Sequence, residues 1–414
     1  MSSDPLVPIS AGCLEELATG PLQGVVTPYI EAFHARRYAK STISHYLSCL
    51  AHFSHWLKLE EAVLSDIDTE LVEHFIRSHL RGCTCPLWLR STVSENRAAL
   101  RHLLGYLPQR DRVSTPITGE LDRFDDHLRS ICGLAAQTRS RRRRTVGGLL
   151  SYCFGTTAPI VSRLSSAQVE AFTGKLSLRV RPATLGVICS DLRSYFRFRA
   201  LQGDSTEALV VALPRIPTWR HPPLPTGLSE AQCELFLHAF DRSNPVELRD
   251  YAIARCLLDL GLRGDEVTHL SLESLDWHTG TLLVCSTKSK RAHRMPLPTS
   301  TGEAVADYLQ QGRPSTTDRR LFVRHQAPMG KPLSVAAIRN SMNRAFTRCG
   351  LRDQFCNTHV LRRTAAARLQ QAGASAKEIA DVLRHRSLNT ASTYVRIDVE
   401  RLRAVALPWP GSSS

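Results

Sequence analysis

The chain has 414 residues, of which 43% are hydrophobic and 22% are charged, a composition typical of a globular protein and not of a disordered or fibrous one. Lysine and arginine exceed aspartate and glutamate, giving a net charge of +15, so the surface is expected to attract a polyanion, with nucleic acid the first candidate. The sequence has no long apolar run, no secretory leader and no basic helix with large apolar anchors, so we expect a cytoplasmic protein without a membrane partner.

The first 112 residues predict a short tail, 1–22, followed by a helical module, 23–112. The stretch "STISHYLSCLAHFSHWL" has Ile43, Leu47 and Leu50 at helical spacing, with Ser41 or Thr42 as a possible N-cap. A second helical pattern follows at "STVSENRAALRHLLGYL". The module is therefore expected to be helical, with an apolar stripe on each helix.

Cysteine usage predicts free thiols. The 12 cysteines are scattered without the spacing of a disulfide framework. Cys83 and Cys85 in "RGCTCPLW" lie near His74, His79 and His102 in sequence, but C-x-C is not the usual C-x2-C arrangement and two further ligands at finger-like spacing are lacking. The sequence therefore predicts no metal site.

A second helical module, 118–207, repeats the layout of the first. It contains the run "TRSRRRR" and a second basic cluster, "SYFRFRALQ", in which Phe196 and Phe198 are expected in the core. A basic run is usually a solvated helix face, but two clusters together favour contacts with DNA phosphates. The expected contacts are Arg139, Arg141, Arg142, Arg143, Arg144, Arg193 and Arg197.

Residues 208–227 are rich in proline and predict an extended linker, since proline lacks the amide donor and ends helices. The third module, 228–407, with a tail at 408–414, predicts amphipathic helices interrupted by "GTLLVCSTKSKRAHRMPLP", which has the pattern of two or three short strands with a basic hairpin. We expect further helices at 302–311, 335–349, 359–372 and 375–384, the last opened by a Ser375–Glu378 capping box. The chain is thus predicted to be mainly α-helical with one small antiparallel sheet.

Polar residues that could act on a substrate are concentrated in this third module. Arg263 in "GLRGDEV" could pair with Asp265 or Glu266, and the sequence leaves that choice open. His359 and Arg362 in "HVLRR" are three apart, so they share a helix face and can converge on one ligand. Tyr394 in "STYVRI" would, taken alone, be interpreted as an aromatic packing residue.

The order of Arg263, the hairpin lysines, His359 and Arg362, His385 in "LRHRS", and Tyr394 resembles the tyrosine recombinase (phage integrase) family of site-specific DNA recombinases. The resemblance covers 228–407 closely and the two helical modules more loosely, as core-binding domains. One departure is Arg384 before His385, where many relatives have Gly-His; another is the presence of two core-binding-like modules where one is usual.

The resemblance implies roles for individual residues. Tyr394 would be the nucleophile, Arg263 and Arg362 would hold the phosphate, and His359 would be a general base or orienting group. His385 would contact phosphate, and Lys288 would protonate the leaving oxygen. Lys290 and Arg291 share the hairpin with Lys288 and are expected to contact DNA.

The resemblance further implies a covalent 3′-phosphotyrosine intermediate without metal or nucleotide cofactor, and a tetramer assembled on two specific DNA sites. The role could be integration, transposition, inversion or dimer resolution. Two alternatives remain open. "SAKEIADVLRHRSLNTASTYVRI" could be the helix-turn-helix of a non-catalytic DNA-binding protein, or the chain could be a topoisomerase of similar chemistry.

Overall fold

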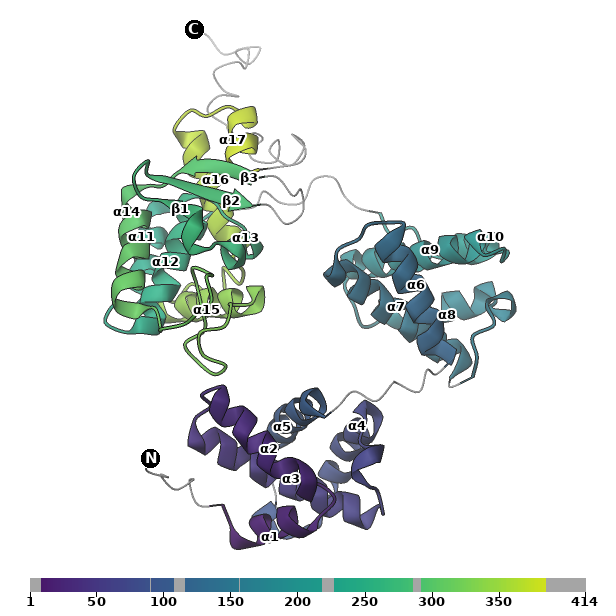
Figure 1. Ribbon diagram of the computed structural model, residues 1–414. Coiled ribbons are helices and arrows are strands. Elements are labelled where there is room, and N and C mark those ends of the chain that lie inside the picture. The colour runs from purple at the N-terminus through teal and green to yellow at the C-terminus, as the bar shows by residue number, and fades with distance from the viewer. Residues whose placement is uncertain are drawn as a thin grey trace. The chain divides into compact units, whose positions relative to one another are not determined.

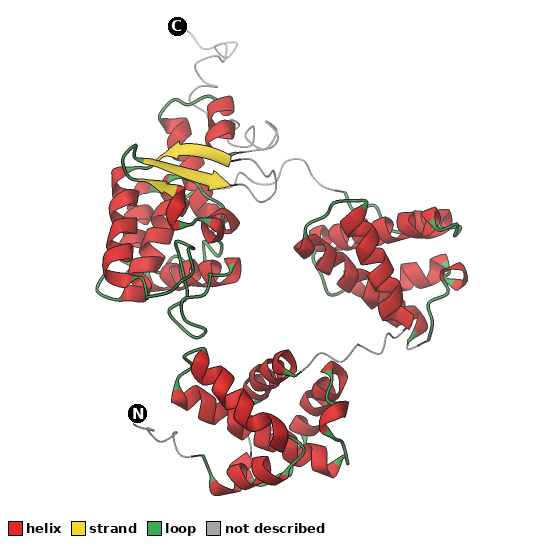
Figure 2. Ribbon diagram, in the orientation of Figure 1, coloured by secondary structure: helices red, strands yellow, loops and turns green. Residues whose placement is uncertain are grey.

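The computed structural model describes residues 9–89, 91–107, 116–155, 157–217, 227–285 and 292–384. The backbone divides into two compact units, residues 104–221 and residues 1–103 together with 222–414. Figures 1 and 2 show that helices predominate and that the strands gather in one small sheet. This confirms the predicted fold class. No helix within the described ranges combines the length and the apolar character that a membrane span requires.

The N-terminal helices are α1 (Ala11–Thr19), α2 (Gln23–Ala35), α3 (Lys40–Leu59), α4 (Thr69–Arg77) and α5 (Val93–Tyr106). Their core contains Phe53 and Phe75, both fully buried, with ring centroids 5.1 Å apart. The Asp68 side chain accepts a hydrogen bond of 2.8 Å from the Leu71 backbone N–H and so caps α4.

Two sequence predictions fail in this region. The predicted tail contains α1, because Ser10 caps its first turn and Leu17 is buried in the core. The N-cap of α3 is Ala39 and neither Ser41 nor Thr42, since the helix already begins at Lys40 and makes no side-chain cap bond. The start of α1 is therefore fixed by a side-chain cap and a buried leucine, and α3 begins before the capping residues that the sequence suggested.

The second group comprises α6 (Pro116–Ser130), α7 (Ala136–Phe154), α8 (Ser166–Ser177), α9 (Pro182–Leu201) and α10 (Glu207–Val211). Phe196 and Phe198 are buried, as the sequence predicted. The start of the predicted linker is helical, because Leu209 on α10 and Leu213 are buried in the same core. The first residues of the predicted linker thus belong to the helical group, and residues 218–226 lie outside the described residues.

The third group begins with α11 (Glu230–His238), α12 (Pro245–Asp259) and α13 (Gly264–His269). The sheet follows, with β1 (Leu275–Asp276), β2 (Thr281–Cys285) and β3 (Ala292–Pro296) antiparallel in the order β1-β2-β3. Helices α14 (Thr299–Asp307), α15 (Val335–Arg348), α16 (His359–Gln371) and α17 (Ala376–Val382) complete it, with a π-helical turn at Tyr308–Gly312 directly after α14.

Helix α12 packs against most of the other helices of this third group. Its Ala252, Ile253 and Leu257 are fully buried in a core shared with α11, α14, α15 and α16. The predicted capping box at α17 is present: the Ser375 backbone N–H donates to the Glu378 carboxylate at 2.7 Å, and the Glu378 backbone N–H donates to Ser375 Oγ at 3.3 Å. Helices α12, α13, α16 and α17 bring Arg263, Arg362 and Arg384 together at one turn.

Candidate active site

Arg263 lies at the point where α12 has ended and α13 begins. Its Nη1 donates to Glu266 Oε1 at 2.6 Å, and its backbone N–H donates to Glu266 Oε2 at 2.9 Å. The structure therefore resolves the choice between Asp265 and Glu266 in favour of Glu266. The Arg263 side chain keeps 29% of its surface exposed, so a ligand can reach its guanidinium.

Arg362 reaches the same turn from α16 and is 4% exposed. Its guanidinium donates to the carbonyl oxygens of Gly261 and Leu383. Gly261 has a φ of +56°, in the left-handed region, and a Cβ there would lie 2.5 Å from Leu383 Cδ2. Only glycine therefore allows this close approach of α16 and the end of α17 to the turn before Arg263.

Arg384 is a further cation at this site, and sequence reasoning assigned it no role. Its Nη2 donates to Glu266 Oε2 at 3.0 Å, and each of the two side chains is only 2% exposed. Its backbone carbonyl accepts a hydrogen bond of 3.1 Å from Arg263 Nη2. Arg384 has a φ of 55°, in the left-handed region that glycine adopts more readily than other residues.

Glu266 is the carboxylate that these arginines share. Burial alone would raise its pKa, but Arg384, the Arg263 backbone N–H and the Arg263 guanidinium together hold the pKa of Glu266 below its usual value. Two guanidiniums, those of Arg263 and Arg384, thus meet the Glu266 carboxylate, and a third, that of Arg362, donates to the backbone carbonyls of Gly261 and Leu383 at the same turn. Because cations are in excess among these four residues, the arrangement favours an anionic ligand such as a phosphate.

His359 is the first residue of α16 and is exposed. Its backbone N–H donates to Asn357 Oδ1 at 2.9 Å. The sequence spacing places it one helical turn before Arg362, on the same face of the helix. Lys288, Lys290, Arg291, His385 and Tyr394 lie outside the described residues, so their predicted roles stay predictions.

In the second helical group, most of the arginines that were predicted to contact phosphate bond to other residues of the same group. Arg141 Nη1 donates to the buried Asp191 carboxylate at 2.6 Å, and Arg142 Nη1 donates to Ser194 Oγ at 2.6 Å. The other pairings are Arg143 with Asp122, Arg139 with Asp125, and Arg193 with the carbonyls of Leu213 and Pro214. Arg144 and Arg197 are exposed.

These bonds show that the basic run on α7 links this helix to α6 and α9. The pKa of Asp191 is raised by burial, and Arg141 and Thr145 oppose that rise by bonding the carboxylate. Sequence reasoning could not foresee these pairings because the acidic partners lie on other helices. The prediction that the run contacts DNA is untested, and Arg144 and Arg197 are the exposed members of the set.

Comparison with known proteins adds independent evidence. A model described as "Phage integrase family" matches residues 227–401. A putative integrase/recombinase of Sinorhizobium fredii, y4rA, is 30% identical over 95% of this chain and 96% of its own length. Tyrosine recombinase XerD of Vibrio cholerae is 27% identical over 70% of this chain and 95% of its own length.

Solved structures share the fold. A XerH site-specific recombinase bound to palindromic difH substrate covers 70% of this chain and 86% of its own, with a TM-score of 0.54 and 19% identity. A lambda integrase dimer bound to a COC′ core site covers 71% of this chain and 99% of its own, with a TM-score of 0.53 and 18% identity. Taken with the arginine cluster at the Gly261 turn, these likenesses identify the chain as a member of the phage integrase family of tyrosine recombinases, the enzymes of site-specific DNA recombination.

Proposed function

We propose that this recombinase breaks and rejoins DNA strands through Tyr394. The Tyr394 Oη attacks a phosphodiester, an Oη–P bond forms, the bond from phosphorus to the 5′ oxygen breaks, and a 3′-phosphotyrosine results. A phenol has a pKa near 10, so supplying phenolate at neutral pH costs about 4 kcal/mol, which neighbouring cations offset. The energy of the broken bond is retained in the phosphotyrosine, so rejoining needs no nucleotide cofactor.

The observation that supports this proposal most is the meeting of Arg263 and Arg362 at the Gly261 turn. Two guanidiniums there can hold the non-bridging oxygens of a phosphodiester and stabilise the added negative charge of the transition state. This is the task that Mg²⁺ performs in many nucleases, so we expect strand cleavage to proceed at the same rate in buffer with and without Mg²⁺.

The remaining residues complete the chemistry. His359, one turn from Arg362, acts as general base or orients the phosphate, and His385 is a further phosphate contact. Lys288, in the segment between β2 and β3, gives the proton to the leaving 5′ oxygen. Lys290 and Arg291 in the same segment bind the DNA backbone.

We further propose that four copies assemble on two DNA duplexes, each carrying a specific site. The similarity in fold to a lambda integrase dimer bound to a core site and to XerH bound to a difH substrate supports recognition of duplex DNA by this chain. The first two helical groups would then flank the DNA, with the exposed Arg144 and Arg197 available to phosphates.

Covalent trapping tests the proposal. A target duplex is selected from random-sequence DNA by binding to the full-length protein, and a nick is placed near the bound site so that the cleaved end diffuses away. Wild-type protein should form an adduct that survives denaturing electrophoresis. Tyr394→Phe should bind the same duplex with unchanged affinity and form none.

Tyr251→Phe, which removes a half-buried phenol from α12 in the same part of the chain, is the matched control and should form the adduct. An adduct from Tyr394→Phe would assign the nucleophile to another residue. Tight binding without any adduct from wild-type protein would instead indicate a DNA-binding protein that does not cleave.

A further inference from the structure

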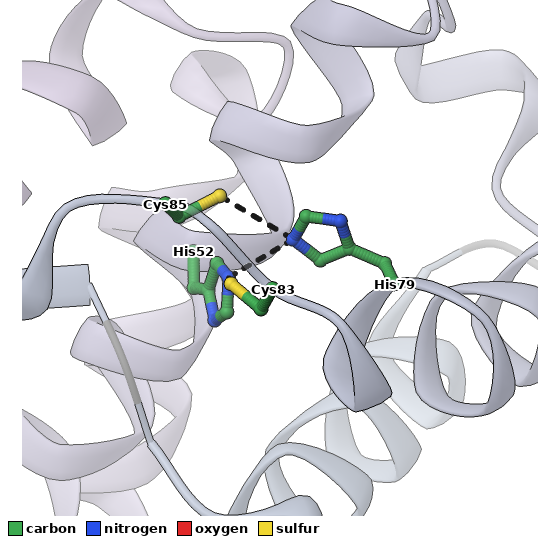
Figure 3. A group of neighbouring side chains, drawn as sticks. All are labelled: His52, His79, Cys83 and Cys85. Carbon is green, nitrogen blue, oxygen red and sulfur yellow. Dashed lines mark hydrogen bonds between the residues drawn. The ribbon is translucent and has the colours of Figure 1, made fainter.

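Four potential metal ligands converge among the N-terminal helices. His52 lies on α3, His79 opens the 3-10 turn His79–Arg81, and Cys83 and Cys85 follow in the next loop. Figure 3 shows the two sulfurs and the two imidazoles turned toward one another. One ligand atom from each residue lies within 4.8 Å of every other. This cluster has no part in the strand-cleavage chemistry proposed above.

The distances fit a tetrahedral ion. The two Nε2 atoms of His52 and His79 are 3.2 Å apart, and Cys83 Sγ is 3.2 Å from His52 Nε2. Cys85 Sγ is 3.3 Å from His79 Nε2. Around a zinc ion with Zn–N of about 2.0–2.1 Å and Zn–S of about 2.3 Å, neighbouring ligand atoms are separated by roughly 3.3–3.8 Å. The three shortest separations lie within a few tenths of an ångström of these values, and the remaining pairs, none farther apart than 4.8 Å, need to close by about 1 Å at most.

Hydrogen bonding alone accounts poorly for this geometry. The Nε2 of each histidine faces two atoms at once, the other Nε2 and one sulfur. A neutral imidazole nitrogen offers either one N–H or one lone pair, so it makes one strong bond and cannot serve both neighbours equally. A cation at the centre accepts a lone pair from all four atoms and satisfies every one of them.

The surroundings suit a closed structural site. His52 is 1% exposed and Cys85 is 6% exposed. The Phe75 ring stacks on His79 and meets His52 edge-on, each with ring centroids 5.3 Å apart, which gives the cluster an apolar wall. A cavity of about 280 Å³ is lined by both His52 and Cys83, so an ion can enter from that side.

We propose that His52, His79, Cys83 and Cys85 bind one Zn²⁺ ion. Two thiolates and two imidazoles form a donor set that selects zinc among the common divalent ions, and four protein ligands leave no open position for catalysis. Both thiols lose their protons on binding. The ion would fasten the loop at 79–85 to α3 and so hold the N-terminal helices together.

Metal analysis of the full-length protein tests this proposal. Protein purified under reducing conditions without chelator should contain about one Zn²⁺ per chain. Cys85→Ser and His79→Gln should each weaken zinc binding by at least about 100-fold, more than the loss of an outer partner of a ligand. Matched controls are Cys132→Ser and His74→Gln, which change an exposed cysteine and an exposed histidine outside the cluster and should keep the zinc.

Cobalt substitution gives a readout that does not depend on the folding of any variant. Wild-type protein in which Co²⁺ replaces the bound ion should show the intense visible bands of tetrahedral cobalt and a near-ultraviolet thiolate-to-cobalt charge-transfer band. Wild-type protein without stoichiometric metal, a cobalt spectrum without thiolate bands, or a Cys83–Cys85 disulfide under reducing conditions would each overturn the proposal. Zinc retained by both ligand variants would do the same.

Discussion

Glu266 is the carboxylate that pairs with Arg263 and Arg384 at the Gly261 turn, and its removal should be costly. Glu266→Gln leaves the Arg384 guanidinium, 2% exposed, without its charged partner. Breaking a buried pair from one side typically costs about 3 kcal/mol of unfolding free energy, measured here by urea-induced unfolding. Asp265→Asn is the control, because Asp265 is 43% exposed and its loss should cost less than about 0.5 kcal/mol.

The pH dependence of stability should change in the same variant. Because the folded-state pKa of Glu266 lies below the usual glutamate pKa of about 4.5, its ionised form stabilises the protein above that pH. The contribution is lost as the pH falls from about 4.5 through the lower folded-state pKa. Glu266→Gln should therefore flatten this acidic part of the stability curve, and an unchanged slope would argue against the shared-carboxylate arrangement.

Gly261 offers a second test at the residue scale, because two glycines in the same region have the same backbone geometry and different surroundings. A Cβ at Gly261 would lie 2.5 Å from Leu383 Cδ2, whereas nothing lies within 4 Å of a Cβ at Gly280, which has a φ of +60°. Gly280→Ala should cost only the left-handed backbone penalty of about 1–2 kcal/mol. Gly261→Ala should add a packing penalty of about 1–3 kcal/mol and lower covalent adduct formation. Equal effects would contradict the close approach.

At the scale of elements, helices α7 and α9 carry two kinds of arginine. Some pair with acidic side chains of neighbouring helices, whereas Arg144 and Arg197 are exposed. Replacing the exposed Arg144 and Arg197 by alanine should lower affinity for target and random duplexes alike. The slope of log affinity against log salt should flatten by about 0.9 for each lost contact, measured by fluorescence anisotropy. A loss confined to the target site would indicate base reading instead.

Arg141→Ala is the matched comparison within the same run. It leaves the buried Asp191 carboxylate with weaker partners, so the unfolding free energy should fall, by about 1 kcal/mol because Arg141 itself is 42% exposed. The salt slope for DNA should stay as in wild-type protein. A flattened slope would place Arg141 on the DNA despite its bond to Asp191.

For the whole molecule, the net charge of +15 predicts strongly salt-dependent binding of any duplex. With about six to ten phosphate contacts, raising the salt from about 50 to 200 mM should lower affinity for random DNA by roughly 10³- to 10⁵-fold. A weak dependence, measured by anisotropy on a random duplex, would mean that the excess charge lies away from the bound backbone.

The sequence predicted those features that depend on residues close together in the chain. Helical spacing predicted α11 to α17, and alternation predicted the sheet, because both depend on residues near one another in the chain. The order of Arg263, the hairpin lysines, His359 and Arg362, His385 and Tyr394 was sufficient to name the family. The partner of Arg263 was not predictable, since Asp265 and Glu266 both lie within three residues of it in sequence and differ in burial, which only the structure shows.

The same limit explains the two largest surprises. The ion pairs of the basic run were not predictable, because partners such as Asp191 lie on other helices. His52 escaped notice as a metal ligand because it lies on α3, far in sequence from Cys83 and Cys85, and no finger-like spacing connects them. Both arrangements are properties of tertiary packing, which a single sequence does not display.

The hydrogen bonds at the Gly261 turn affect when the enzyme becomes active during its synthesis. Its carbonyl accepts hydrogen bonds from Arg362 and Arg384, partners 101 and 123 residues further along the chain. Contacts so distant in sequence form late in folding, after the intervening helices have been synthesised and packed. A ribosome-bound or truncated chain that ends before residue 384 lacks part of the frame that positions Arg263. We therefore expect such a chain to cleave no DNA, so that synthesis from the N-terminus delays strand cleavage until residue 384 has been added.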